Sequence, residues 1–296
     1  MGLLDFLLNL AALLLWLSWR GIGAEQAGGP AGTLLSNLRP ANRSGTARHG
    51  YLLGLVGLLF GRAIVYRQFG PALNWHPSWS PGAVSMVFRS DHFPRMLATS
   101  GLGFAWGLYG LFASSCLVAA LHRPPADKDG LTREIRRRLG WLATWPPVLL
   151  LALPLILLAA AWGPLGYLAA RAGLVPALRN PAHLAEQCLV VGLGAVLVWR
   201  WLLTGVLILY FINSYVFFGA SPVWDFVQQT GAKLCRPVAW VRLGQVQIGP
   251  LILLALTWGT VGLLGTGFPG LKRSLPGLPQ WLEHGVLPYL YRNLPW

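Results

Sequence analysis

Six long blocks of apolar residues alternate with shorter polar segments along the chain. A helix needs about 20 apolar residues to cross a hydrocarbon core of about 30 Å, so the pattern predicts about six membrane-spanning helices. The blocks cover approximately residues 3–19, 50–66, 97–121, 141–162, 186–217 and 248–264. Pro146, Pro147 and Pro154 predict a kink or a late start in the fourth block. The over-long fifth block predicts a strong tilt or an extension beyond the bilayer.

Two proline-rich stretches lie outside these blocks. Residues 69–94 are too long for a simple connector, so we expect them to fold over the membrane surface, with a short strand over residues 83–88. In the tail, residues 268–296, the part from 280 to 293 predicts an amphipathic helix in the membrane interface. The predicted fold class is all-α: a polytopic transmembrane helix bundle of about six spans with interfacial loops and a C-terminal amphipathic segment.

The composition fits a lipid environment, because 55% of the 296 residues are apolar and 11% are charged, whereas a soluble domain carries about 25% charged residues. The formal net charge of +14 does not indicate nucleic-acid binding, since the basic residues lie in short loops and form no contiguous face. The first, third and fifth loops hold 13 Lys and Arg residues, against 8 in the other loops and the tail. The positive-inside rule therefore predicts both termini outside the cytoplasm.

The sequence holds no pattern that indicates an active site or a metal site. Cys116, Cys188 and Cys235 are isolated, which excludes the spacings of zinc and redox motifs. The 9 acidic residues are scattered, and nucleotide-binding and hydrolase motifs are missing. Separate spans could each supply one histidine to a haem or pigment, but no feature supports such a cofactor. We predict no enzyme activity, no catalytic residue, no metal and no cofactor, and we expect bound lipid.

Glycines recur at helical spacing in two of the apolar blocks. They are Gly50, Gly54, Gly57 and Gly61 in the second block, and Gly103 and Gly107 in the third. Lipid tails are as apolar as leucine, so helices associate in a bilayer through close backbone approach, which glycine permits. We expect these glycines to pack within the bundle, with a face for another subunit as the alternative.

Two Arg-Pro steps indicate an internal repeat. Arg39-Pro40 and Arg236-Pro237 are 197 residues apart, and the same shift superimposes the first span on the end of the fifth and the second span on the sixth. Each copy contains a span, a loop, the Arg-Pro step and a second span. The two copies run in the same direction across the predicted membrane, unlike the inverted repeats of many transporters.

The second copy resembles the YggT family of small bacterial and plastid membrane proteins. The resemblance covers residues 207–258, with Ser-Pro-Val-Trp-Asp at 221–225, Leu-Cys-Arg-Pro at 234–237 and Ile-Gly-Pro at 248–250. Asn-Ser-Tyr at 213–215 departs from the Arg and Ser-Trp that are usual there. The resemblance implies a multi-pass protein of the bacterial cytoplasmic (inner) membrane, with a role in the assembly or organisation of membrane complexes. No catalytic residues carry over from the family.

The repeat and the resemblance divide the chain into four parts. Residues 1–66 form a degenerate first YggT-like unit, and residues 67–185 form an inserted membrane region with a surface loop and two spans. Residues 186–264 form the second unit, and residues 265–296 form a proline-rich and aromatic interfacial tail.

Arg200 is the charge that stands out within a predicted span, where it lies between Trp199 and Trp201. A bare cation at the centre of a bilayer costs about 2.5–3.5 kcal/mol on insertion scales, so Arg200 must reach the interface, pair with an anion or face protein. One interpretation is a charge that binds a partner or a cofactor. The other is an interfacial anchor at one end of the over-long helix.

Further arginines are predicted to contact lipid or a partner. Arg39 and Arg236 precede Pro40 and Pro237 in loops beside the membrane, where a guanidinium can bind phosphate or carboxylate or cap a neighbouring helix. A short basic stretch before the fourth span predicts an anchor to anionic headgroups. It contains Arg136, Arg137 and Arg138.

A short helix is predicted to begin beside the second Arg-Pro step. Ser221 suits its N-cap, Pro222 its first position and Asp225 its first turn, where a carboxylate complements the helix dipole. We interpret these three residues as a structural motif.

The features together favour a non-enzymatic membrane scaffold, an accessory subunit or an assembly factor of a larger membrane complex. Its expected partners are membrane lipids and other membrane protein subunits, with no nucleic acid. The alternative is a transporter or channel for a small solute, which would need polar groups at the middle of the bilayer.

Overall fold

The computed structural model describes residues 2–25, 46–81, 84–122, 130–175, 180–216, 221–243, 246–268 and 279–293. Helices dominate the described chain, and the described strands are two residues long. The chain divides into two compact units, of which the first comprises residues 1–79 and 86–109 and the second residues 80–85 and 110–296.

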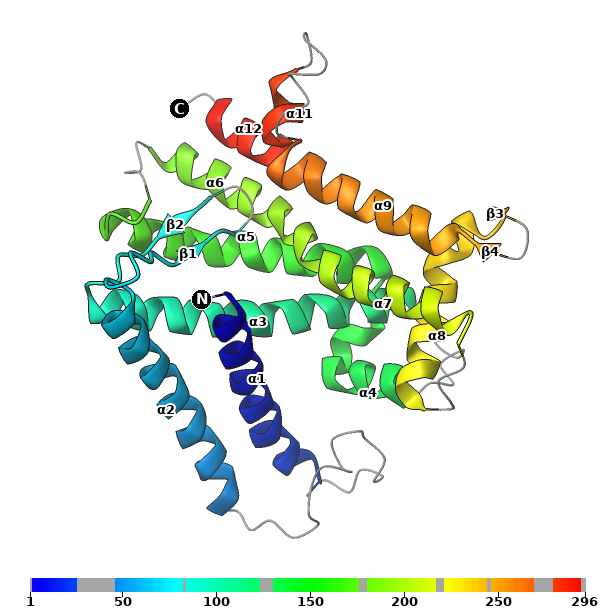
Figure 1. Ribbon diagram of the computed structural model, residues 1–296, viewed down its shortest axis with the longest axis horizontal. Helices are drawn as coiled ribbons and strands as arrows, with labels where there is room; N and C mark the ends of the chain where they lie inside the picture. The colour runs from blue at the N-terminus through cyan, green and yellow to red at the C-terminus, as the bar shows by residue number, and fades with distance from the viewer. Residues whose placement is uncertain are drawn as a thin grey trace. The chain divides into compact units, whose positions relative to one another are not determined.

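The first unit is built on an antiparallel helix pair. Helix α1 (Gly2–Glu25) lies beside α2 (Thr46–Phe69), with Leu15 of α1 against Gly54 of α2 (Figure 1). Helix α3 (Phe93–Leu121) begins in this unit. Between α2 and α3, strands β1 (Ser78–Trp79) and β2 (Met86–Val87) pair antiparallel. Of the strand predicted for residues 83–88, the structure confirms residues 86 and 87, and the other described residues of that stretch are not in a strand.

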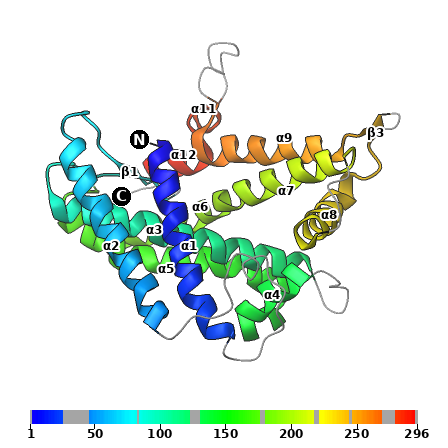
Figure 2. The ribbon, with the colours of Figure 1, turned by 60° about the horizontal axis from the view of Figure 1, so that its bottom comes forward.

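The second unit continues α3 and adds helices α4 to α7. Helix α4 (Gly130–Leu139) passes into the 3₁₀ helix η1 (Gly140–Thr144), and α5 follows (Pro147–Arg171). The late start predicted for the fourth span is confirmed, since α5 begins at Pro147 and contains Pro154 and Pro164. Helix α6 (Pro181–Gly194) runs antiparallel to α5 (Figures 1 and 2) and is joined to α7 (Trp199–Asn213) by the 3₁₀ helix η2 (Ala195–Val198).

The remaining elements complete the second unit. Helix α8 (Pro222–Cys235) leads through η3 (Arg236–Val238) and the strands β3 (Arg242–Leu243) and β4 (Val246–Gln247) to α9 (Gly249–Val261). Helix α9 lies antiparallel to α7 (Figures 1 and 2) and ends in a π-helical turn, η4 (Gly262–Thr266). The short helices α11 (Gln280–His284) and α12 (Val286–Asn293) follow.

The core of the second unit lies where α3, α4, α7 and α8 meet. One cluster of buried side chains joins α3, α4, η1 and α5, and a neighbouring one joins α3, α7 and α8. The backbones come closest where a glycine faces another helix. A β-carbon at Gly192 of α6 would lie 2.8 Å from the Ala159 β-carbon of α5, so α6 can pack there only because position 192 lacks a side chain.

Four described helices are long and apolar enough to cross a membrane. They are His49–Phe69, Phe93–Leu121, Pro147–Arg171 and Pro181–Asn213. These helices correspond to the second, third, fourth and fifth predicted spans. The predicted first span lies in α1, which has 24 residues, and the predicted last span lies in a shorter apolar helix, Gly249–Gly265. The structure is therefore all-α with candidate membrane spans.

The predicted amphipathic helix of the tail is interrupted. Gly285 separates α11 from α12 and has φ +85°. Gly267, which precedes the tail, has φ +67°, and a β-carbon there would lie 2.2 Å from the backbone oxygen of Glu283. Both positions adopt the left-handed region that glycine tolerates best, so the sequence fixes the turns that fold the tail back toward η4.

Candidate functional site

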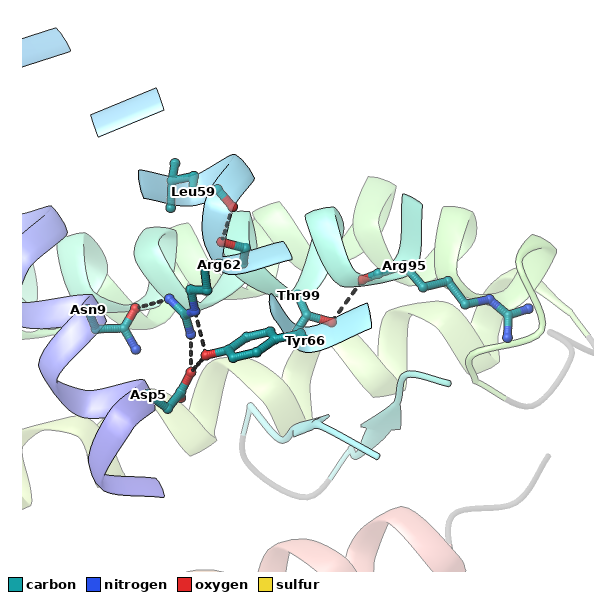
Figure 3. A network of polar contacts seen from close by, with 8 residues as sticks. Asp5, Asn9, Leu59, Arg62, Tyr66, Arg95 and Thr99 are labelled. Atoms are coloured by element: carbon teal, nitrogen blue, oxygen red, sulfur yellow. Dashed lines mark hydrogen bonds and ion pairs between the residues drawn. The ribbon is translucent and has the colours of Figure 1, made fainter. Parts of the chain in front are cut away.

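A buried arginine joins α1 to α2 in the first unit (Figure 3). The Arg62 side chain of α2 is 2% exposed, and its Nη2 forms an ion pair with Asp5 Oδ1 of α1. Its Nη1 donates to Asn9 Oδ1 at 2.7 Å, and its Nε donates to the Tyr66 hydroxyl at 2.6 Å. The Tyr66 hydroxyl in turn donates to Asp5 Oδ1. Each nitrogen of the guanidinium thus has an oxygen partner.

Helical spacing brings these four side chains together. Asp5 and Asn9 are four residues apart on α1, and Arg62 and Tyr66 are four residues apart on α2, so each pair occupies one face of its helix. A third helix approaches the same point. A β-carbon at Gly103 of α3 would lie 3.1 Å from Arg62 Nη2 and 3.5 Å from Asn9 Oδ1, so the α3 backbone passes directly over the guanidinium.

The cluster places opposite charges within an apolar environment. Arg62 lies inside the apolar helix His49–Phe69, where an unpaired cation would be costly. The Asp5 carboxylate offsets this charge, and its side chain is 39% exposed. The arrangement can therefore do two things chemically: it clamps three helices together, and it leaves one titratable oxygen-bearing group accessible from outside.

Smaller polar contacts extend the cluster along α2 and α3. Ser100 Oγ of α3 donates to the Leu59 carbonyl of α2 at 3.0 Å, and the Tyr66 ring meets Trp75 edge-on with centroids 4.8 Å apart. Thr99 Oγ1 donates to the Arg95 carbonyl within α3 at 2.9 Å (Figure 3). The Ser100 contact links α3 to α2, and the Tyr66–Trp75 contact packs the segment after α2 against that helix.

A second polar cluster ties α3, α4 and α8 together in the other unit. The fully buried His122 lies with Nδ1 2.8 Å from Lys233 Nζ and Nε2 3.0 Å from Thr230 Oγ1. Because an ammonium can only donate, Nδ1 of His122 accepts in its contact with Lys233. Arg136 of α4 donates to the backbone oxygens of His122 and, at 3.1 Å, Ala143.

A third cluster joins α5, α6 and α12 around a fully buried glutamine. Trp162 Nε1 donates to Gln187 Oε1 at 3.2 Å, and Gln187 Nε2 lies 3.1 Å from His183 Nε2 and 3.4 Å from the Tyr291 hydroxyl. This buried amide connects the tail to the apolar helices. No role for Gln187 was predicted from the sequence, because Trp162 and Tyr291 lie 25 and 104 positions away along the chain.

Arg200, the charge singled out from the sequence, lies at the start of α7. Its guanidinium carbon is 5.0 Å from the centre of the Trp201 ring, and its Nε is buried without a hydrogen-bond partner among the described residues. It lines a recess between α7 and α9. Arg62 and Arg200 both lie within predicted spans, but they differ in their hydrogen bonds. Every guanidinium nitrogen of Arg62 has a partner, whereas Arg200 Nε has none.

The other predicted arginines have different surroundings. Arg39 and Pro40 lie outside the described residues. Arg236 is exposed at the start of η3 and lines a recess next to Tyr210. The Pro237 carbonyl accepts a hydrogen bond from Trp240 Nε1 at 3.2 Å. Contact of Arg236 with lipid or a partner stays a prediction.

The basic stretch of α4 is used partly within the chain. Arg137 and Arg138 form ion pairs with Glu134 at 2.6 and 2.9 Å, and about half of each arginine side chain is exposed. Arg136 instead caps backbone oxygens, as described above. Arg137 and Arg138 thus remain available to anionic headgroups, whereas Arg136 is committed to the internal packing.

Helix α8 begins as its sequence indicates. Ser221 is the N-cap, with extended backbone, and its side chain accepts a hydrogen bond from the Trp224 amide at 3.5 Å. Pro222 is the first helical residue, and Asp225 lies in the first turn.

Among the described residues, no group of three or more His, Cys, Asp or Glu side chains is placed to hold a metal ion. Comparison with known protein families, curated proteins and solved structures finds no match to this chain.

Proposed function

We propose that this chain is a non-enzymatic integral membrane protein that serves a larger membrane complex as a scaffold, accessory subunit or assembly factor. In this proposal the six predicted spans all cross the bacterial inner membrane, and both termini lie outside the cytoplasm. The resemblance of residues 207–258 to the YggT family supports the same role. Lipids and other membrane subunits are the proposed partners.

The open glycine face of α2 carries the proposal. Gly57 and Gly61 form a GxxxG step, and a β-carbon at either position would meet nothing within 4 Å. By contrast, Gly54 of the same helix packs against Leu15, and Gly107 of α3 packs against Leu13. The glycines therefore divide into those that pack within the chain and those that face away from it.

A transmembrane helix of another subunit fits this face. Helices associate in lipid through close packing of small residues, because lipid tails offer no hydrophobic driving force. Large apolar side chains flank the GxxxG step and are exposed: Leu53 is 68% exposed and Ile64 53% exposed. A partner helix could approach the backbone at Gly57 and Gly61 and pack between these two side chains.

The polar clusters support a structural role for the rest of the chain. His122 and Gln187 are each buried among partners that come from separate helices. Such groups are satisfied by the protein itself, as expected for residues that hold helices together.

The Asp5–Arg62 pair favours a second candidate, a transporter or channel for a small solute. Ionisable residues inside spans often mark ion or proton pathways, and the Asp5 carboxylate is accessible. This candidate would use protonation of Asp5 to change the α1–α2 packing. We rank it second, because the packing of α1, α2 and α3 is enough to account for the cluster.

Purification of the tagged protein from its native membranes in a mild detergent tests the two candidates. The scaffold proposal expects stoichiometric co-purification with a complex or substoichiometric association with an immature one. The Gly57→Leu/Gly61→Leu variant should lose that association but remain folded and monodisperse. Gly163→Leu in α5 is the control, since position 163 is equally open but lies on another helix.

Two results would contradict the scaffold proposal. One is a solitary protein that drives solute or proton flux in liposomes, with flux abolished by Asp5→Asn. The other is a complex that both leucine variants retain fully. Identification of the co-purifying proteins by mass spectrometry would name the complex.

A further inference from the structure

Two helices depart from α-helical geometry where they face each other in the second unit. The 3₁₀ helix η2 interrupts the apolar run Pro181–Asn213, and the π-helical turn η4 ends α9. A β-carbon at Gly265 of η4 would lie 3.2 Å from Leu197 Cδ1 of η2, so the two irregular turns are in contact. Irregular turns inside long helices often occur at functional sites.

A small recess lies beside these turns, between η2 and α7 on one side and α9 and η4 on the other. Its walls are largely apolar, with Leu203 and Val261 among them. Thr257 and Thr260 also line it, but their hydroxyls donate to carbonyls of their own helix, at 2.7 and 2.8 Å. Trp199 lines it as well, and its Nε1 donates to the Ala113 carbonyl at 2.9 Å. The charged group of the lining is Arg200.

Arg200 lacks an anionic partner within the described chain. Its Nε is buried and makes no hydrogen bond, and its guanidinium lies over the face of the Trp201 ring. Thr204, one turn further along α7, lies behind the residues that line the recess, and its buried Oγ1 also makes no hydrogen bond. Buried polar groups are normally satisfied, so these two atoms indicate that something outside the described chain completes the site.

The missing component must supply anionic oxygens next to an apolar body. A guanidinium binds phosphate or carboxylate through charge-assisted hydrogen bonds, and the apolar walls of the recess suit hydrocarbon. Trp201 and Trp258 stand nearby with ring centroids 6.0 Å apart, and they are 63% and 43% exposed. Tryptophan at such a position prefers the boundary between headgroups and hydrocarbon.

We propose that the recess at Arg200 is a binding site for the anionic headgroup of a membrane amphiphile. Arg200 binds the phosphate or carboxylate oxygens, Thr204 adds a hydroxyl on the same helix face, and the chains lie along the exposed apolar surface of α7 and α9. The site is independent of the glycine face of α2 and of the scaffold role.

Native mass spectrometry of the purified protein in detergent tests this site. The protein is titrated with dioleoylphosphatidylglycerol, dioleoylphosphatidylcholine or oleate. We expect one tightly bound molecule of phosphatidylglycerol or oleate, depending on whether the site prefers a phosphate or a carboxylate. Phosphatidylcholine, which is zwitterionic, should bind more weakly. Arg200→Gln should weaken the anionic adduct about tenfold or more, the effect of losing a charged hydrogen bond. Thr204→Val should weaken it less, and Arg200→Lys should give an intermediate affinity.

Arg171→Gln is the matched control. Arg171 ends α5 and stacks on Tyr167 at 5.2 Å, much as Arg200 stacks on Trp201, but it does not line the recess. This variant should keep wild-type affinity for the anionic lipid. If Arg200→Gln is unstable, Arg200→Lys and Thr204→Val decide the question.

Equal affinity of the Arg200 and Thr204 variants and the wild-type protein for every anionic lipid would overturn the proposal. So would an Arg200→Gln variant that loses the zwitterionic lipid to the same extent, because the loss would then reflect general damage. Tighter binding of oleate than of phosphatidylglycerol would identify a carboxylate as the preferred group, and the reverse would identify a phosphate.

Discussion

Gly103 of α3 lies against the guanidinium of Arg62 in α2, so closely that a β-carbon at position 103 would be 3.1 Å from Nη2. This contact makes three helices depend on one small residue. The packing requires a glycine at position 103 in particular. At Gly101 of the same helix, a β-carbon would meet nothing within 4 Å.

Gly103→Val should destabilise the protein, whereas Gly101→Ala should be neutral or slightly stabilising. Overpacking costs about 1–3 kcal/mol, and replacing a helical glycine by alanine gains about 0.5–1 kcal/mol where space allows. Thermal unfolding in detergent measures both. A fall in Tm with Gly101→Ala as large as that with Gly103→Val would contradict the contact.

Removing one partner of the Asp5–Arg62 pair should cost more than removing both. Asp5→Leu leaves a buried guanidinium unpaired, a loss of about 3–5 kcal/mol in a closed site and less here because Asp5 is 39% exposed. Asp5→Leu/Arg62→Leu should recover part of that loss. A double-mutant cycle on unfolding free energies measures the coupling, and strictly additive effects would show that the pair does not interact.

Cys235 should react slowly with alkylating reagents at neutral pH. Burial raises the pKa of its thiol to about 11, so the reactive thiolate is scarce until the pH approaches that value. Iodoacetamide labelling followed by peptide mass spectrometry gives the rate as a function of pH. Rapid labelling of the folded protein at pH 8 would show that this thiol is exposed.

The same pKa shift makes a prediction for stability. The folded thiol keeps its proton up to about pH 11, whereas an unfolded cysteine releases it near pH 8.5. The stabilisation is therefore fully present below pH 8.5 and is lost as the pH rises toward 11. Cys235→Ala should flatten this alkaline decline, which unfolding at pH 8, 9.5 and 11 would reveal.

Gln187→Ala should loosen the tail as well as lower stability. The substitution removes the amide that contacts Trp162, His183 and Tyr291, and a buried polar group left without its partner costs about 1–3 kcal/mol. Limited proteolysis should then cut α12 faster. Gln228→Ala, at an exposed position of α8, is the control and should change neither measurement.

Local sequence patterns predict the helices better than they predict the residues of the candidate site. Four of the predicted spans coincide with described helices that are long and apolar enough to cross a membrane, because a helix in contact with lipid would have to be apolar along its whole length. The N-cap at Ser221 follows from neighbouring residues. The start of α6 at Pro181, with Asn180 as its cap, carries a similar signal, although hydropathy alone predicts that the apolar block begins at residue 186.

The charged cluster could not be read from neighbouring residues. Asp5 and Arg62 are separated by 57 positions, and their meeting depends on how α1 packs on α2. The Asp5/Asn9 and Arg62/Tyr66 spacings were the available signal. Arg200 stood out because it is a charge within a predicted span. The 3₁₀ turn before it, Ala195–Val198, contains neither glycine nor proline and reads as continuous helix.

The Asp5–Arg62 pair also bears on how the chain is made. Helix α1 leaves the ribosome before α2, so the carboxylate of Asp5 is already present when Arg62 arrives at the membrane. Under the proposed membrane topology, α2 alone would carry an uncompensated cation into the bilayer, whereas an α1–α2 hairpin would enter with that charge neutralised. We therefore expect the two helices to insert together, so that the order of the sequence would matter for assembly as well as for the final contact.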